Sequence, residues 1–111
     1  MNLLEMYCEF LKKGDVDGLC EIFAEDAVFH DEAPVQIGQK PIHLEGIKAI
    51  RQMFGTMIPS DGMGISNVVV YENAMRYDIQ LGNMLFLALA VMKVENGRIK
   101  ELQVVASRQG G

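Results

Sequence analysis

A short stretch in the first third of the chain places a carboxylate at the end of an apolar strand pattern. Ala27, Phe29 and Asp31 lie two residues apart, so on a strand their side chains share one face. Burial of a carboxyl on such a face raises its pKa toward the range of a general base. The alternative is structural, because an aspartate beside Glu32 and close to Pro34 often accepts a hydrogen bond from its own backbone in a turn.

His30, Glu32 and His43 are candidates for metal ligation. His30 and Glu32 alternate onto the strand face opposite to Asp31, and His43 returns near them later in the chain. Their spacing matches no established zinc signature, and Cys8 forms no CxxC pair with another cysteine. No glycine-rich phosphate fingerprint is present either. We therefore expect a site with no metal and no organic cofactor.

Tyr7 is a third residue that could do chemistry. Together with Leu3, Phe10 and Leu11 it recurs at helical spacing, so it lies on the apolar stripe of a predicted helix. A tyrosine on such a stripe is usually a core residue whose hydroxyl bonds a backbone carbonyl. A position facing a cavity is the alternative.

The elements that position these residues follow from the spacing of apolar side chains. Helices are predicted up to Gly14, after an N-cap at Asp15, and from about residue 44 to the stop at Pro59. Strands are predicted over 27–31, 65–71, 74–81, 84–94 and 99–106, with room for an edge strand at 35–37. Three helices and a late meander of strands indicate an α+β fold, in which helices cover one face of a curved, mainly antiparallel sheet.

Residues 84–92 form an apolar run too long for a strand that has one solvated face. A second copy of the chain is the simplest cover, so we expect a homodimer through the sheet. The run is shorter than the roughly 20 residues that cross a bilayer, and Glu5 and Glu9 interrupt the N-terminal apolar stretch. This pattern predicts a cytoplasmic protein without a membrane partner.

Composition narrows the class of protein further. The 111 residues are 50% apolar and fit one compact domain, residues 1–111. The formal net charge is −5, and the first 32 residues hold nine acids and two lysines, which disfavours nucleic acid as a partner. Cys8 and Cys20 are expected to be buried, reduced thiols.

Two tracts resemble a known group of proteins. Residues 7–31, YCEFLKKGDVDGLCEIFAEDAVFHD, resemble the opening of ketosteroid isomerases and SnoaL-like polyketide cyclases of the nuclear transport factor 2-like superfamily. Residues 44–54, LEGIKAIRQMF, are similar to the third helix of that group. The resemblance implies a cystatin-like cone, in which a strongly bent sheet wraps the third helix and a ligand cavity opens at the wide end.

The same resemblance implies roles for single residues. Asp31 matches the general base of ketosteroid isomerase, and Tyr7 matches the tyrosine that donates a hydrogen bond to the substrate oxygen. Moving a proton next to a carbonyl requires such a base and such donors. Ala90 stands where that enzyme has a second donor, a protonated acid, so the chain departs from the group at this position.

We therefore expect a small, mainly apolar carbonyl ligand and isomerase or cyclase chemistry by proton transfer. The residues predicted to contact the ligand are Phe10, Phe23, Phe29, Phe54, Met57, Met84, Phe86, Ala88, Ala90 and Leu102. The alternative is a non-catalytic module that binds a small molecule or dimerises, because this fold hosts many functions. Epoxide hydrolysis, a third class, requires an Asp-Arg-Asp set that is not evident in the sequence.

Overall fold

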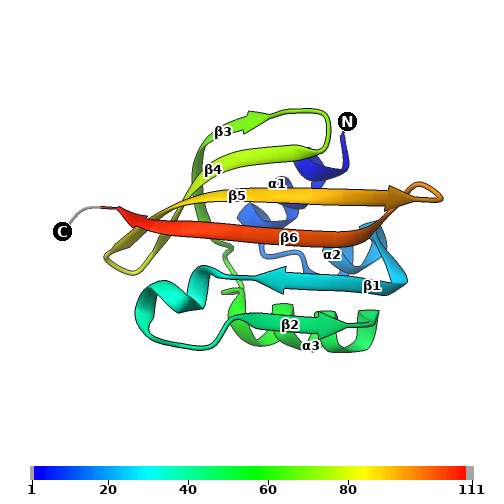
Figure 1. Ribbon diagram of the computed structural model, residues 1–111, viewed down its shortest axis with the longest axis horizontal. Helices are drawn as coiled ribbons and strands as arrows, with labels where there is room; N and C mark the ends of the chain where they lie inside the picture. Colours follow the sequence, from blue (N-terminus) through cyan, green and yellow to red (C-terminus); the bar gives the residue numbers. More distant parts are fainter. Residues whose placement is uncertain (1, 110–111) are drawn as a thin grey trace.

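The computed structural model describes residues 2–109, which form three α-helices and a six-stranded sheet (Figure 1). The elements are α1 (Leu3–Lys13), α2 (Val16–Ile22), β1 (Phe23–Asp31), a short 3-10 helix (Ala33–Ile37), β2 (Ile42–Glu45), α3 (Ile47–Met57), β3 (Gly64–Val70), β4 (Ala74–Leu81), β5 (Met84–Glu95) and β6 (Arg98–Gln109). No helix in this described range has the length and apolar character needed to span a membrane.

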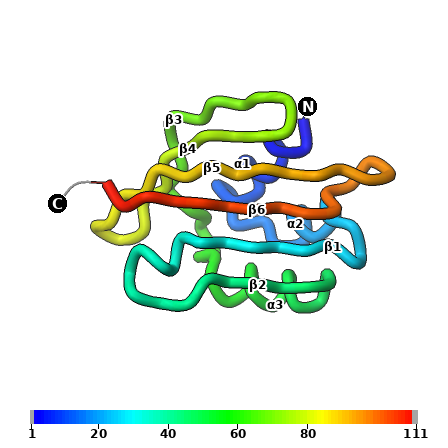
Figure 2. Tube along the Cα trace, in the orientation of Figure 1, coloured from blue at the N-terminus to red at the C-terminus, as the bar shows by residue number. Residues whose placement is uncertain are grey.

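The sheet has the strand order β2-β1-β6-β5-β4-β3. Strands β3 to β6 form the predicted antiparallel meander, and β1 joins it through a parallel pairing with β6. Figure 2 shows β6 lying beside β1, although more than sixty residues separate them in the sequence. The helices lie together behind one face of the sheet (Figure 1). The predicted α+β cone is therefore confirmed.

Capping residues fix the ends of the first two helices as predicted. The Gly14 backbone is left-handed at φ 72° and closes α1. The Asp15 carboxylate then accepts a hydrogen bond from the Gly18 N–H at 2.9 Å and opens α2. The Asn2 side chain accepts a hydrogen bond from the Leu4 N–H at 2.6 Å and so caps the start of α1.

The loop after α3 packs tightly on the end of α1. The Met63 N–H donates to the Leu11 carbonyl at 2.9 Å. Gly62 has φ +90°, and a Cβ at this position would lie 1.7 Å from the Lys12 carbonyl oxygen. Only glycine fits so close to another backbone, and this approach brings Met63 against the inner face of the sheet.

Several boundaries differ from the sequence prediction. Strand β1 begins at Phe23 rather than at residue 27, and β6 extends to Gln109 rather than to residue 106. Residues 33–37 form a 3-10 helix rather than an edge strand, because Pro34 suits the first turn of a helix and Gly38, at φ 77°, ends it. The edge strand is β2, so Leu44 belongs to it and α3 begins only at Ile47. Gly46, with φ 92°, makes the turn between the strand and the helix.

The core lies between the helices and the concave face of the sheet. Four aromatic rings meet there, with centroid distances of 5.7 Å for Phe29–Phe54, 6.0 Å for Phe23–Phe54 and 6.3 Å for Tyr7–Phe23. Cys8 and Cys20 are buried and unpaired. This packing fills one end of the cone and leaves the other end open.

Candidate active site

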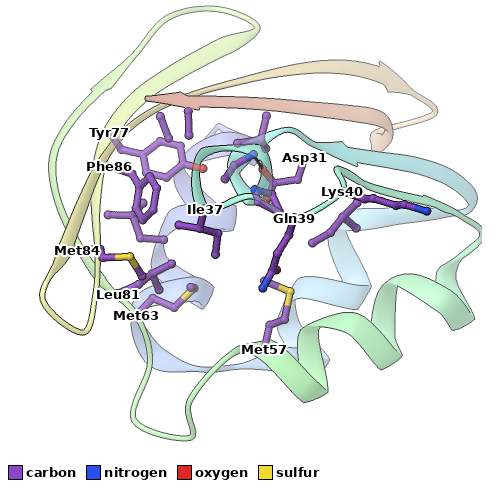
Figure 3. A pocket seen from close by; sticks show the side chains of 17 residues that line it. Asp31, Ile37, Gln39, Lys40, Met57, Met63, Tyr77, Leu81, Met84 and Phe86 are labelled. Atoms are coloured by element: carbon purple, nitrogen blue, oxygen red, sulfur yellow. Dashed lines mark hydrogen bonds between the residues drawn. The ribbon is translucent and has the colours of Figure 1, made fainter. Parts of the chain in front are cut away.

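A cavity of about 300 Å³ opens at the wide end of the cone (Figure 3). That volume is at the lower end of the roughly 300–1,000 Å³ of small-molecule sites. Its wall is mostly apolar, and its polar lining side chains are Asp31, Gln39, Lys40 and Tyr77. A smaller cavity of about 50 Å³ adjoins it, shares Asp31 and Tyr77, and reaches Tyr7.

Small side chains leave this space unfilled. Tyr77 on β4 is the cross-strand partner of Ala88 on β5, which in turn is the partner of Ala106 on β6. Both alanines line the cavity, and neither is large enough to fill the volume beside the Tyr77 ring. The small side chains on the inner face of β5 and β6 thus leave a pocket, which larger residues at these positions would fill.

Asp31 ends β1 and lies in the wall of both cavities. Burial raises the pKa of its carboxyl, while the hydrogen bond from Ala33 and the nearby His30 act in the opposite direction. The Ala33 N–H donates to Oδ1 at 2.8 Å. No other hydrogen bond to this carboxyl forms within residues 2–109. The turn interpretation is therefore observed at Oδ1, while Oδ2 has no hydrogen-bond partner within residues 2–109 and the role of Asp31 as a base stays a prediction.

Tyr7 combines a packed ring with a buried hydroxyl group. Its ring packs on Phe23 and Phe54. The pKa of the Tyr7 hydroxyl is raised, mainly by burial and then by its electrostatic interactions with Tyr77 and Asp31. The hydroxyl therefore keeps its proton at neutral pH. It forms no hydrogen bond with another residue of the described chain, yet it is not a fully enclosed unsatisfied group. The hydroxyl is therefore available as a donor at the inner cavity.

Tyr77 is the site residue that sequence reasoning missed. It lies on β4, and Figure 3 shows its hydroxyl pointing across the cavity toward Asp31. Burial, and then the Asp31 charge, raise its pKa. The phenol is therefore protonated at neutral pH and can donate a hydrogen bond. The alternation of Met75, Tyr77 and Ile79 with polar residues indicated that the strand has two different faces, but it could not show which of them faces the cavity.

The structure brings some of the predicted ligand contacts together and leaves others elsewhere. Met57, Met84, Phe86 and Ala88 line the larger cavity, and Phe29 and Phe54 line the inner one. The residues outside both linings are Phe10, Phe23, Ala90 and Leu102. Ala90 is fully buried between its cross-strand partners Met75 and Val104, in the closed part of the core.

Much of the remaining wall comes from segments without periodicity. The further lining residues of the larger cavity are Ala33, Pro34, Ile37, Gln39, Lys40, Ile42, Met63, Ile79, Leu81, Val104 and Ala106. Six of these lie in the segment 33–42, which comprises the 3-10 helix, the loop after it and the first residue of β2. Only the folded chain shows that this segment walls the cavity.

The comparisons with known proteins agree with this architecture. A family model of the SnoaL-like domain matches residues 4–102, so the chain belongs to the SnoaL-like domain family. An NTF-2 like protein of unknown function from Burkholderia xenovorans LB400 is similar in structure, with a TM-score of 0.74 and 17% identity over 98% of this chain and 83% of that one.

Two further solved structures carry functional names. A "putative ketosteroid isomerase" from Kribbella flavida has a TM-score of 0.70 and 14% identity, over 98% of this chain and 78% of its own. A "putative polyketide cyclase" from Sinorhizobium meliloti has a TM-score of 0.63 and 19% identity, over 92% of both chains. No curated protein matches the sequence. At such identities the structural likeness establishes the fold alone.

Proposed function

We propose that this protein is an isomerase or cyclase that moves a proton next to the carbonyl group of a small, mainly apolar compound. One observation carries the proposal: Asp31 and Tyr77 face each other across an apolar cavity, and Tyr7 lines the smaller cavity that shares both residues with it. A base and two neutral donors around one ligand-sized space are the groups that enolisation requires.

The chemistry follows from the groups present. The free oxygen of Asp31 takes a proton from the carbon beside the ligand carbonyl, and the electrons of that C–H bond move into the carbonyl system. Negative charge then develops on the ligand oxygen, where the Tyr77 and Tyr7 hydroxyls donate hydrogen bonds. Asp31 returns the proton to another carbon, which isomerises the ligand. In a cyclase, the enolate carbon instead attacks a second carbonyl of the same molecule.

Tyr77 supplies a second hydrogen-bond donor, which the resemblance to ketosteroid isomerase left missing at Ala90. Ala90, which aligns with the protonated acid of ketosteroid isomerase, is closed off in the core. Tyr77 reaches the cavity from the neighbouring strand β4, where it pairs with Ala88, two residue pairs from Ala90. A phenol with a raised pKa serves the same purpose as a neutral carboxylic acid, because each donates a hydrogen bond without carrying a charge.

The cavity favours proton transfer over hydrolysis. Asp31 is the one carboxylate among its lining residues, and no arginine lines it in the described chain. Water activation between aspartates and an arginine therefore has no counterpart here. Lys40 is the cation of the lining, and it lies in the segment at the mouth. Two of the similar structures, named a "putative ketosteroid isomerase" and a "putative polyketide cyclase", support the same class of reaction, whereas a third is an LEH-like epoxide hydrolase.

The test follows deuterium exchange beside the carbonyl of a cyclic ketone, and conjugation of a β,γ-unsaturated ketone by absorbance. Asp31→Asn keeps the side-chain shape and the bond from Ala33 but cannot accept the proton. It should slow turnover about 100- to 10,000-fold, the usual contribution of a general base, while ligand affinity changes little. Asp78→Asn is the matched control, since Asp78 lies on the outer face of β4 and bonds Asn67.

The rival function is a non-catalytic module that binds a small molecule in the same cavity. It would be favoured if the native protein bound ketones, by quenching or calorimetry, and catalysed no exchange on any of them. Equal exchange rates in native protein and Asp31→Asn would likewise remove Asp31 as the base.

We further propose that the working form is a homodimer that covers the outer face of β5 and β6. Leu89 is 38% exposed and Val105 50% exposed, and they are cross-strand partners on that face. Leu85 and Val91 extend the same apolar surface along β5. A contiguous apolar surface of this kind on a sheet is typical of an interface.

A further inference from the structure

The two histidines of the chain meet on the outer face of the sheet, away from the cavity. His30 on β1 and His43 on β2 are direct partners in an antiparallel pair. Their Nδ1 atoms are 3.2 Å apart. The pair stands in a shallow hollow that is also lined by Glu32, Glu101 and Gln103. Sequence spacing alone gave no metal signature here, because the register of β1 and β2 is what joins the two rings.

The other nitrogen of each ring faces a carboxylate. His30 Nε2 lies 3.1 Å from Glu32 Oε1, and His43 Nε2 lies 3.3 Å from Glu45 Oε2. An ionised carboxylate only accepts, so Nε2 of each ring is the donor in these two contacts. With Nε2–H on both neutral rings, the two Nδ1 atoms present lone pairs to each other at 3.2 Å. A cation between the two nitrogens removes the repulsion between these lone pairs.

We propose that His30 and His43 bind a divalent transition-metal ion of the zinc type through their two Nδ1 atoms. An ion about 2.0–2.1 Å from each nitrogen would subtend an N–metal–N angle of roughly 100° at this spacing. That angle is close to tetrahedral. Imidazole nitrogens prefer zinc, copper and nickel over magnesium or calcium. A proton shared between the rings is the competing occupant.

The surroundings match what metal-bound histidines require. A ligating histidine usually donates its second N–H to a carboxylate, which fixes the ring and makes the ligating nitrogen more basic. Glu32 and Glu45 hold these positions, while Glu101 at the edge of the hollow is paired with Lys93 at 3.7 Å. The side chains of His30 and His43 are 29% and 52% exposed, so an ion can reach them from solvent.

The site is open rather than closed. No group of three or more potential ligands is arranged around one point within residues 2–109. Water, or another group that binds the bound ion, therefore fills the remaining positions. A metal ion here ties the edge strand β2 to β1 at the base of the segment 33–42, which walls the cavity. Metal binding should therefore also raise the unfolding temperature.

The experiment measures zinc binding to the untagged full chain by calorimetry near neutral pH. Native protein should bind one zinc ion per chain and nickel as well, and magnesium should not compete. His30→Gln and His43→Gln should each abolish saturable binding. Glu45→Gln should keep the site but weaken it about 10- to 100-fold, as expected for a carboxylate that orients a ligand. Affinity should fall on acidification, because protons compete for Nδ1.

Long-range proton–nitrogen NMR of the two imidazoles gives an independent test. Zinc should shift the Nδ1 resonance of both rings and leave Nε2 protonated. Circular dichroism of each histidine variant verifies that it is folded. Unchanged zinc affinity in either histidine variant, coordination through Nε2, or no binding by folded native protein would overturn the proposal. The last result would assign the pair to a shared proton.

Discussion

The two faces of strand β1 carry different chemistry on consecutive residues. Phe29 and Asp31 point into the cone, where burial raises the pKa of the carboxyl. His30 and Glu32 point outward and hydrogen-bond each other at 3.1 Å. The Asp31 carboxylate is largely removed from solvent, whereas the Glu32 carboxylate stays hydrated and contacts the His30 ring nitrogen. The same functional group thus becomes a candidate base on one face and an orienting partner on the other.

The comparison extends across the sheet to β5. Its inner residues Phe86 and Ala88 line the cavity, whereas Leu89 on the outer face is exposed to solvent in the single chain. The cavity thus lies on the inner face, and the proposed ion site and the proposed dimer surface lie on the outer face. The following variants test whether the two faces are functionally separate, from the largest expected effect to the smallest.

The largest effect should come from the tyrosines of the inner face. Tyr77→Phe removes one donor and keeps the ring, so turnover should fall about 100- to 1000-fold, as for other oxyanion donors. Tyr7→Phe should also slow turnover, through the smaller inner cavity that it lines. Steady-state kinetics on the ketone assay measures both. Tyr71→Phe, at an exposed tyrosine, is the control and should leave the rate unchanged.

On the outer face, Leu89→Asp should disrupt the proposed dimer. A charge placed in an apolar interface lacks a partner, and burying it should weaken association about 100-fold or more. Light scattering across a dilution series should show a dimer for the native chain and a monomer for the variant. A native chain that is monomeric at all concentrations would contradict the interface. Glu101→Gln, outside that apolar surface, should leave the association intact.

Two alanines of β5 separate the open part of the inner face from the closed part. Ala88→Leu adds volume toward the cavity, so it should block ligand binding with little loss of stability. Ala90→Leu adds the same volume to a fully packed position and should destabilise the fold by about 1–3 kcal/mol. Ligand titration and urea unfolding distinguish the outcomes. Equal loss of stability in both variants would mean that the cavity closes in solution.

The smallest effect is a pH-dependent gain of stability in Asp31→Asn. Burial raises the pKa of Asp31 above its ordinary 3.8, so the folded chain binds this proton more tightly than the unfolded chain. Native stability therefore falls as pH rises from the ordinary toward the raised pKa. The variant lacks this loss, so it should be more stable than the native protein at neutral pH. Thermal unfolding across pH should show the gain vanish below pH 3.8.

Several features of the fold could be predicted because they depend on local physics. Gly14 and Asp15 define a helix end and a helix start by backbone conformation and capping, and both are confirmed. Alternation in β4 and the turns of the meander likewise predicted the antiparallel hairpins. The edge strand was predicted at 35–37 and lies at Ile42–Glu45, since a four-residue strand carries too few side chains to show a period.

For the site, the sequence by itself determined that Asp31 shares a face with Phe29, because strand alternation is a local rule. It could not decide that Tyr77 faces Asp31, that Ala90 is enclosed, or that His30 meets His43. Those facts depend on register between strands and on the curvature that brings β4 opposite β1. Local spacing fixes the direction of a side chain relative to its own strand, whereas its partners are fixed by contacts between residues far apart in the chain.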